Sequence, residues 1–188
     1  GNEGGASDIY LYDLVSKKLD NLTDDVFSDS EPSWNSDGTQ IVFVSDRDKI
    51  IDKNKMSSNG MFYHNYKQKN IYTLNLETKK INQITDTQYN ENYPIFANTK
   101  DAIFYTADYQ GTWNLFRHDL LTGESVVITN LLTGLFQLSL TKDDGSLVFS
   151  GYSGLGWDVY RLNNPLELKK TTVEPTNYIA NREKNDKE

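Results

Sequence analysis

Two histidines and a large set of carboxylates are the residues of this sequence that could carry chemistry. His64 and His118 lie far apart, and neither belongs to a His-x-x-x-His spacing, which lets two imidazoles on one helical face bind zinc. The chain has no cysteine, which removes thiol nucleophiles, disulfides and Cys–zinc sites together. It also has no Gly-x-Ser-x-Gly segment to form a nucleophile elbow. The sequence therefore predicts no catalytic residue and no cofactor.

The overall composition narrows the class of protein. The 188 residues carry a net charge of −8 and show no basic stripe, which argues against a nucleic-acid partner. No run of about 18 apolar residues is present, so we expect no membrane-spanning helix. Twelve Tyr and eight Phe in a 37% hydrophobic chain favour an ordered domain built from β-strands.

An internal repeat is the strongest signal in the chain. An Asp or Asn is followed by an alternating strand, first as Asp-Ile-Tyr-Leu-Tyr-Asp-Leu at residues 8–14. The copies begin at Asp8, Asn70, Asn114 and Asp158, in steps of 62, 44 and 44 residues. Four-stranded propeller blades repeat at about 40–50 residues. The spacing therefore predicts such blades, with an insertion in the first step at residues 48–69.

A second motif recurs between the copies. Glu-Pro-Ser-Trp at residues 31–34 leads through Asp37-Gly38 into the apolar strand 41–45, and Asp144-Gly145 stands in a corresponding place later in the chain. Asp-Gly between two apolar runs predicts a hairpin with a type I′ turn, because both central positions of that turn need a positive φ.

Together these motifs resemble the repeat of the TolB-like and WD40-like (PD40) β-propeller family. The resemblance implies an all-β fold, a partial β-propeller of four-stranded antiparallel blades with about three and a half blades in this chain. Each blade would run through strands A (Pro-x-Trp), B (Ile-x-Phe), C (Ile-Tyr) and D (ending Leu-Thr). The propeller segment would cover residues 1–172, as blade pieces 8–23, 32–85, 94–129 and 137–172, followed by a polar C-terminal tail at 173–188. The first piece would supply strands C and D only. The remaining blades would lie upstream, or self-association with another copy would close the ring.

Most singled-out side chains have a structural interpretation. In strand C, alternate residues such as Tyr12 and Leu74 are expected to fill the layers between blades, and His118 occupies the same slot, so we expect a packed structural histidine. The Asx residue before each strand C is expected to bond its own backbone. Trp34 is expected in the core, and Asp46-Arg47 is expected to be a local ion pair or a loop anchor.

The insertion is the best candidate for contact with a partner. A long loop with its own apolar residues is often functional, and Met and aromatic side chains are common at interfaces. The predicted partner-binding residues are Met56, Met61, Phe62, Tyr63, His64 and Tyr66. The alternative is a loop that folds back on its own blade.

Calcium is a minor alternative. In the family that the repeat resembles, the B–C and D–A loops emerge on one face, which would place several carboxylates beside the insertion. Ca²⁺ prefers several oxygen ligands. The weak candidate ligands are Asp29, Asp46, Asp86 and Asp108.

The sequence is compatible with three functions. The first is a non-catalytic module for protein or peptide recognition in a bacterial cell-envelope protein, periplasmic by family resemblance. The second is the substrate-gating propeller of a prolyl-oligopeptidase-like serine peptidase whose catalytic domain lies outside this chain. The third, a sugar- or metal-binding propeller enzyme such as a lyase, usually requires several inward-facing histidines, which this chain lacks.

Overall fold

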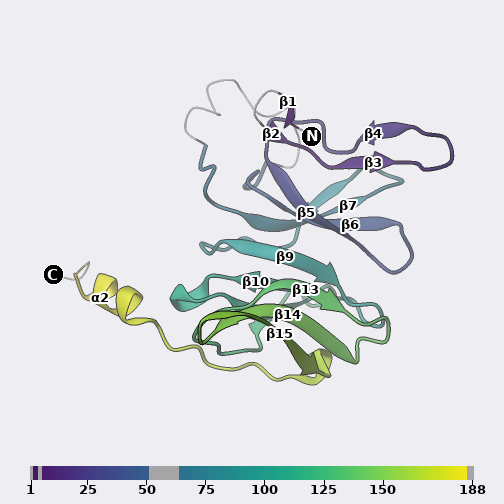
Figure 1. Cartoon of the computed structure of the whole chain (residues 1–188). Coiled ribbons are helices and arrows are strands. Elements are labelled where there is room, and N and C mark those ends of the chain that lie inside the picture. The colour runs from purple at the N-terminus through teal and green to yellow at the C-terminus, as the bar shows by residue number, and fades with distance from the viewer. Residues whose placement is uncertain (1, 4–5, 51–63, 186–188) are drawn as a thin grey trace. The chain divides into compact units, whose positions relative to one another are not determined.

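A computed structural model describes residues 2–3, 6–50 and 64–185 of the chain (Figure 1). These residues fall into two compact units, Gly1–Asn90 and Glu91–Glu188. Every sheet among the described residues is antiparallel and joins strands in chain order.

Unit 1 contains one four-stranded sheet and two strand pairs among its described residues. The pairs are β1 (Asn2–Glu3) with β2 (Ala6–Ser7), and β3 (Tyr10–Tyr12) with β4 (Leu19–Asn21). The four-stranded sheet consists of β5 (Asp29–Trp34), β6 (Gln40–Ser45), β7 (Asn70–Asn75) and β8 (Ile81–Gln83).

Unit 2 contains a four-stranded and a three-stranded sheet. The first consists of β9 (Glu91–Phe96), β10 (Ala102–Ala107), β11 (Asn114–Asp119) and β12 (Ser125–Val127). The second consists of β13 (Phe136–Leu140), β14 (Ser146–Ser153) and β15 (Gly156–Asn163). The helical elements are η2 (Tyr109–Gly111), η3 (Pro165–Glu167) and α2 (Asn177–Asn185).

The sheets follow the predicted repeat and confirm the fold class. The pair β3–β4 corresponds to strands C and D of a first blade, and β5–β8 and β9–β12 are complete blades. In both complete blades strand B is mostly apolar and almost entirely buried, as β6 and β10 show. The described chain is therefore an all-β, partial β-propeller of antiparallel blades.

Each unit has its own apolar core between stacked sheets. In unit 1, Ile9 and Leu22 beside the β3–β4 pair pack on a cluster that contains Phe43 of β6 and Tyr72 of β7. In unit 2, the core joins the two sheets through residues that include Phe104, Leu115, Leu135, Leu147 and Phe149. Each such side chain contributes about 1.5–3 kcal/mol when it is fully buried.

Two side chains of unit 1 that were expected to be buried are half-exposed. Tyr72 and Leu74 are fully buried, as expected for strand C, but Tyr12 is 49% exposed. Trp34 is 48% exposed, so its assignment to the core was wrong. It pairs with Ile41 and therefore shares the face of the sheet that β3–β4 covers. That cover has two strands only, which leaves the edge of the face at Trp34 open.

The predicted type I′ turns do not form. Among the residues 36–39, only Gly38 has a positive φ, of 74°, and a hydrogen bond from Asn35 N to Gln40 O closes a four-residue loop. In the later copy it is Asp144, with a φ of 57°, that adopts the left-handed conformation, not Gly145. The Asn35 side chain stabilises the longer loop because its Oδ1 accepts hydrogen bonds from the amides of Thr39 and Gln40.

Strand A of every blade carries the same bulge. The pairing with strand B shifts at one point in β5, β9 and β13, so that two residues of strand A face one residue of strand B. The first residue of each bulge is left-handed: Glu31 (φ 54°), Tyr93 (φ 54°) and Gln137 (φ 58°). This conformation is uncommon for any residue other than glycine. Its recurrence at steps of 62 and 44 residues makes it a regular part of the blade.

A hydrogen-bond pattern that we call the C–D latch recurs between strands C and D. The residue after Asp8, Asn70 or Asn114 donates its amide to the Oγ1 of the Thr that follows strand D, and its carbonyl accepts the amide of the residue before that Thr. The amide–threonine pairs are Ile9–Thr23, Ile71–Thr85 and Leu115–Thr129, at 3.1, 2.8 and 2.9 Å.

The Asx side chains belong to the same latch. Thr23 Oγ1 donates to Asp8 Oδ1 at 3.2 Å, and Thr129 Oγ1 donates to Asn114 Oδ1 at 3.0 Å. In the copy between them, Asn70 Nδ2 donates to the carbonyl oxygen of Thr85. The Asx residues are structural, as expected, but their partner is the strand-D threonine of the same blade.

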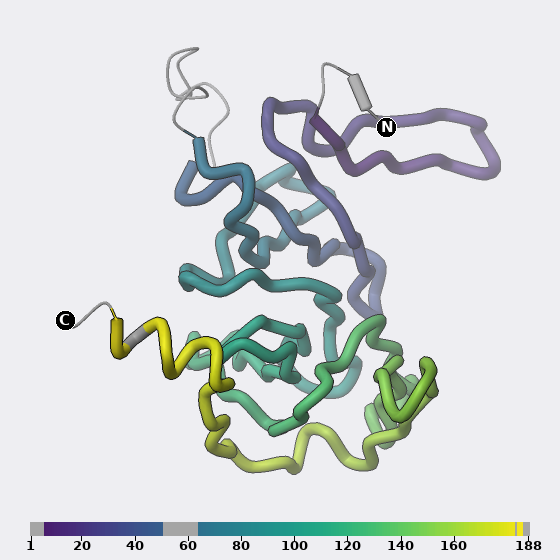
Figure 2. Tube along the Cα trace, turned by 60° about the vertical axis from the view of Figure 1, so that its left-hand side comes forward, coloured from purple at the N-terminus to yellow at the C-terminus, as the bar shows by residue number. Residues whose placement is uncertain are grey.

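The last blade differs from the prediction. The segment 168–172, expected as its strand D, does not pair with β15. Asn164, with a φ of 49°, and Pro165 turn the chain away from β15, and the amide of Thr171 donates to the carbonyl of Val127 in β12 at 3.0 Å. Figure 2 shows this stretch leaving the green strands and running on to α2.

Arg117 of β11 fixes the crossing segment. Its Nη1 donates to the carbonyl oxygens of Leu166 and Leu168 at 2.6 and 3.0 Å. The segment thus covers the blade β9–β12, and β15 remains the outermost strand of its sheet among the described residues.

Candidate functional site

Arg47 lies at the centre of a buried polar cluster in unit 1. It follows β6 directly, and its side chain is 1% exposed. Nη2 donates to both carboxylate oxygens of Asp29 at 2.6 Å, Nη1 donates to Asp25 Oδ2 at 3.0 Å, and Nε donates to Ser45 Oγ at 2.9 Å. The guanidinium thus joins strand β6, strand β5 and the loop before β5.

Aromatic rings surround the same guanidinium. The Arg47 Cζ atom lies 5.5, 5.3 and 5.6 Å from the ring centroids of Phe27, Phe43 and Tyr72. Cation–π attraction is strongest when the cation is desolvated, as it is here. The expected Asp46–Arg47 ion pair is therefore wrong, because Arg47 pairs with Asp25 and Asp29. Its role as an anchor of this loop stands.

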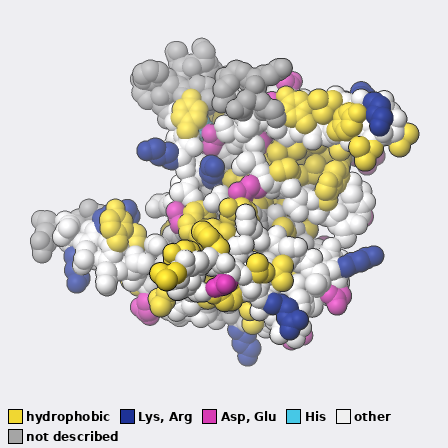
Figure 3. All heavy atoms as spheres, in the orientation of Figure 1, with side chains coloured by type: hydrophobic (Ala, Val, Ile, Leu, Met, Phe, Trp, Pro, Cys, Tyr) yellow, Lys and Arg dark blue, Asp and Glu magenta, His cyan; other side chains and the backbone are white. Residues whose placement is uncertain are grey.

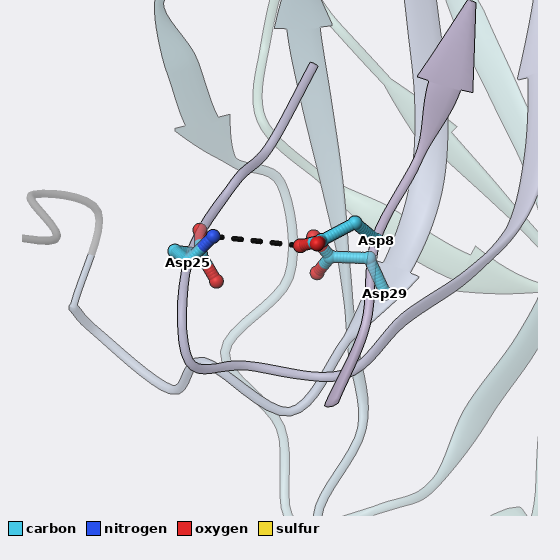
Figure 4. Close-up of side chains that lie close together, drawn as sticks. All are labelled: Asp8, Asp25 and Asp29. Atoms are coloured by element: carbon cyan, nitrogen blue, oxygen red, sulfur yellow. Dashed lines mark hydrogen bonds between the residues drawn. The ribbon is translucent and has the colours of Figure 1, made fainter. Parts of the chain in front are cut away.

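Asp8, Asp25 and Asp29 bring three carboxylates together beside Arg47 (Figure 4). One oxygen of each lies within 4.8 Å of the others, and the amide of Asp25 donates to Asp8 Oδ1. Burial raises the pKa of both Asp25 and Asp29 above the ordinary value, although the charge of Arg47 opposes the rise. The cluster is consequently held together by a cation that the protein itself supplies.

The weak candidate calcium ligands are not gathered into one site. Asp29 accepts hydrogen bonds from Arg47, and Asp46 stands next to Arg47 in the loop after β6. Asp86 is exposed and follows β8. Asp108 belongs to the other unit. The carboxylates that do converge in the described residues are Asp8, Asp25 and Asp29, and both oxygens of Asp29 already bind the guanidinium. Calcium binding stays a prediction.

The predicted partner-binding residues fall at the insertion. Met56, Met61, Phe62 and Tyr63 lie outside the described residues. Of the other two, Tyr66 is 54% exposed and contacts the ring of His64 edge-on at 4.8 Å.

The His64 side chain is 5% exposed and packs into the blade. Its ring centroid lies 5.3 Å from that of Phe27, and its Nε2 lies 3.7 Å from Asp46 Oδ1. Asp46 in turn accepts a hydrogen bond from the amide of Ser28. The returning end of the insertion is thus tied to the loop that Arg47 anchors, and a role of these residues in partner binding remains a prediction.

Unit 2 contains a half-open hollow with aromatic walls. Its volume is about 430 Å³, and it is lined by Tyr93, Phe136, Gln137, Ser150 and Trp157. The Phe136 ring meets those of Tyr93 and Trp157 nearly edge-on, at 6.5 and 5.5 Å between centroids. Ser150 Oγ donates to Gln137 Oε1 at 2.9 Å, which orients the exposed amide.

Two strand-A bulges build this hollow. Tyr93 and Gln137 are the left-handed residues of β9 and β13, and both side chains line it. Left-handed backbone at a residue other than glycine costs of order 1–3 kcal/mol and clusters at binding sites. The arrangement offers apolar ring faces beside one hydrogen-bonding amide, and the lining residues include no acid–base pair.

Sequence reasoning missed most of this hollow. It assigned no binding role to the side chains of Tyr93, Phe136, Gln137, Ser150 or Trp157. The repeat alignment could have shown that the bulge residues occupy one equivalent position. Each stands directly before an aligned residue of strand A: Glu31 before Pro32, Tyr93 before Pro94 and Gln137 before Leu138.

No helix within the described residues is both long and apolar enough to cross a membrane.

No family model matches the sequence, and no curated protein matches it. Among solved structures, the chain is similar to TolB from Acinetobacter baumannii, with a TM-score of 0.61 and 20% identity over 83% of this chain and 35% of that one. A putative TolB from Agrobacterium tumefaciens gives a TM-score of 0.69 and 16% identity over 87% and 55%. A structure from a study of two prolyl endopeptidases gives 0.55 and 15% over 83% and 24%. These likenesses show the β-propeller fold, and the chain spans about a third to a half of the two TolB chains.

Proposed function

We propose that this chain is a non-catalytic β-propeller module that recognises protein or peptide segments, within a periplasmic protein of the bacterial cell envelope. The observation that carries the proposal is the aromatic hollow of unit 2, which the left-handed residues Tyr93 and Gln137 help to form. The similarity to two TolB structures supports the propeller module and the envelope setting.

The chemistry of the hollow suits a peptide. Small-molecule and peptide sites of about 300–1,000 Å³ are mostly apolar and carry a few placed polar groups. The rings of Tyr93, Phe136 and Trp157 would hold an apolar or proline side chain, and the Gln137 amide would bond a backbone group beside it. Aromatic side chains are enriched at interfaces because they bury a large area at a small entropy cost.

A second candidate is the substrate-gating propeller of a prolyl-oligopeptidase-like peptidase. The similarity to the prolyl endopeptidase structure favours it, since this chain covers 24% of that larger protein. The sequence of the parent protein would distinguish the two proposals. A Gly-x-Ser-x-Gly segment downstream of these blades would favour the peptidase, whereas a second propeller or an envelope anchor would favour the recognition module.

A peptide selection tests the proposal directly. A displayed library of random peptides would be selected on the chain, and each selected peptide would be measured against the Tyr93→Gly variant. Glycine keeps the left-handed backbone without strain and removes the ring, so folding should persist while binding weakens about tenfold or more.

A triple variant, Met56→Ser, Met61→Ser and Phe62→Ser, tests the insertion separately. If peptides bind all variants equally, neither the hollow nor the insertion recognises them, and the proposal fails. If only the triple variant loses binding, the insertion is the recognition surface and the hollow is not.

A further inference from the structure

The outer edge of β15 is the place where the repeat is incomplete. Strands β3, β7 and β11 each pair with a strand D, whereas β15 ends its sheet among the described residues. Trp157 is 64% exposed and Val159 is 78% exposed, although the residues equivalent to Val159 are almost fully buried. Hydrophobic side chains also gather over the part of unit 2 where β14 and β15 lie (Figure 3).

The three C–D latches show which hydrogen-bonding groups a strand D offers to strand C. Val159 stands one repeat after Leu115, and the amide and carbonyl of Leu115 both bond strand D, at Thr129 Oγ1 and Ile128 N. The same holds for Ile9 and Ile71 in their blades. In an antiparallel sheet such a residue turns both backbone groups to the same neighbour. Val159 therefore offers one donor and one acceptor to the open edge.

Asp158 supplies the side-chain part of the latch. It is equivalent to Asp8 and Asn114, whose Oδ1 atoms accept the hydroxyl of the strand-D threonine. Ser153 Oγ donates to Asp158 Oδ2 at 2.6 Å across the β14–β15 hairpin. The second carboxylate oxygen, Oδ1, is the acceptor for an incoming hydroxyl, in the role that one Asx oxygen has in the latches of Asp8 and Asn114. An incoming threonine hydroxyl would complete the pattern.

The chain's own next segment does not meet these requirements. One repeat after Val126 and Thr129 stand Lys170 and Val173. Lys170 would lie directly opposite Arg161, because Arg161 is equivalent to Arg117, which pairs with Val126. Like charges opposite one another destabilise a strand pair, and valine has no hydroxyl for Asp158. This accounts for the crossing of the segment to the blade β9–β12.

We propose that the outer edge of β15 binds an extended segment of the form Asp-x-Leu-Thr or Asp-x-Ile-Thr from a partner protein, as an added antiparallel strand. The acidic residue lies opposite Arg161, the apolar residue donates its amide to Val159, and the threonine hydroxyl bonds Asp158. The chain itself shows the same pattern at the end of β4 and just after it, in Asp20-Asn21-Leu22-Thr23, where Asp20 pairs with Leu11, the equivalent of Arg161. This site goes beyond the aromatic hollow and does not depend on it.

The test uses a labelled peptide with the sequence of residues 18–24, Lys-Leu-Asp-Asn-Leu-Thr-Asp, added to the intact chain. Fluorescence anisotropy should show saturable binding with one peptide per chain. Replacing the peptide threonine by valine removes both the donor to Asp158 and the acceptor for the Val159 amide, and should weaken binding roughly tenfold. Asp158→Ala in the protein removes the first of these bonds only, so it should weaken binding less, and in combination with the valine peptide it should add little to the effect of that peptide. Thermal melting of the variant checks that it is folded.

Two matched comparisons distinguish binding as an added β-strand from non-specific binding of the peptide. N-methylation of the peptide leucine removes the amide that bonds Val159 and should abolish binding, whereas N-methylation of the preceding asparagine, whose amide points away from β15, should have little effect. A peptide with lysine in place of its first aspartate should bind several-fold more weakly, and Arg161→Glu should restore it.

Three results would overturn the proposal. The first is the absence of saturable binding at millimolar peptide. The second is equal loss from the two N-methylated peptides. The third is a dimer of the chain that the peptide dissociates, which would assign the edge to a second copy. Binding of the library-selected peptides at the hollow is measured separately, so the failure of one proposal leaves the other standing.

Discussion

Replacement of Arg47 by methionine is the most informative single change in this protein. The side chains of Asp25 and Asp29 are 3% and 0% exposed, and Arg47 is the cation that pairs with both. Removal of one partner of a buried ion pair costs about 3–5 kcal/mol, because an uncompensated charge stays in the interior. Methionine preserves most of the contact with Phe27, Phe43 and Tyr72, so the loss reports mainly on charge. We expect a loss of about 4 kcal/mol at pH 7.

The pH dependence gives this prediction its signature. Burial raises the pKa of Asp25 and Asp29 in the folded chain above the unfolded value of 3.8. Their contribution to stability is therefore fully present below that value and is lost as the pH rises through the folded pKa. Without Arg47, both pKa values should rise further, so the variant should lose much less stability at pH 4 than at pH 7.

Urea denaturation followed by tryptophan fluorescence at the two pH values measures the effect. The double variant Arg47→Met, Asp29→Asn should recover part of the loss at pH 7, because it removes one of the two stranded charges. A loss below about 1 kcal/mol, or an equal loss at pH 4 and pH 7, would refute the account of Arg47 as the charge that holds this loop.

The remaining predictions concern single positions. Tyr93→Gly should raise the midpoint of urea denaturation or leave it unchanged, because the gain of about 1 kcal/mol from a relaxed backbone offsets the lost ring contact; a large loss would show that the bulge is not strained. Asn114→Ala should cost about 1–2 kcal/mol, because the hydroxyl of Thr129 and a backbone amide lose their acceptor, and a double-mutant cycle with Thr129→Val should show the coupling. Burial lowers the pKa of His118, so the chain should lose stability as the pH falls below about 6.5, and His118→Leu, which copies Leu74 in the equivalent slot, should remove that dependence; an unchanged acid limb in thermal melts would contradict it.

The repeat could be predicted from the sequence because a period is a property of the sequence itself. Strands C, the first three strands D and the burial of His118, which is 5% exposed, all follow from side chains that recur at fixed steps. The faces of the outer strands could not be predicted in the same way. Tyr12 and Trp34 have the residue types of a buried layer, and their exposure depends on which neighbouring sheet is present.

The candidate site was harder to predict because it depends on long-range pairing and on backbone conformation. Asp46-Arg47 suggests a local ion pair, yet Arg47 pairs with Asp29 on the neighbouring strand β5 and with Asp25 in the loop before it. The left-handed bulge at Tyr93 has no propensity signal, since the residue before a proline ordinarily favours extended backbone. Only the superposition of three blades makes it visible as a rule.

The crossing of the chain from β15 to β12 links the two sheets of unit 2 mechanically. Proteolytic cleavage after Asn163 would release the segment that follows it. Strands β11 and β12 would then be less stable, because Arg117 and Val127 would lose their hydrogen bonds to that segment. Amide hydrogen exchange should therefore speed up in β11 and β12 of the nicked chain while β14 stays protected. The segment after β15 thus stabilises the blade β9–β12, whose last strand ends about forty residues earlier in the chain.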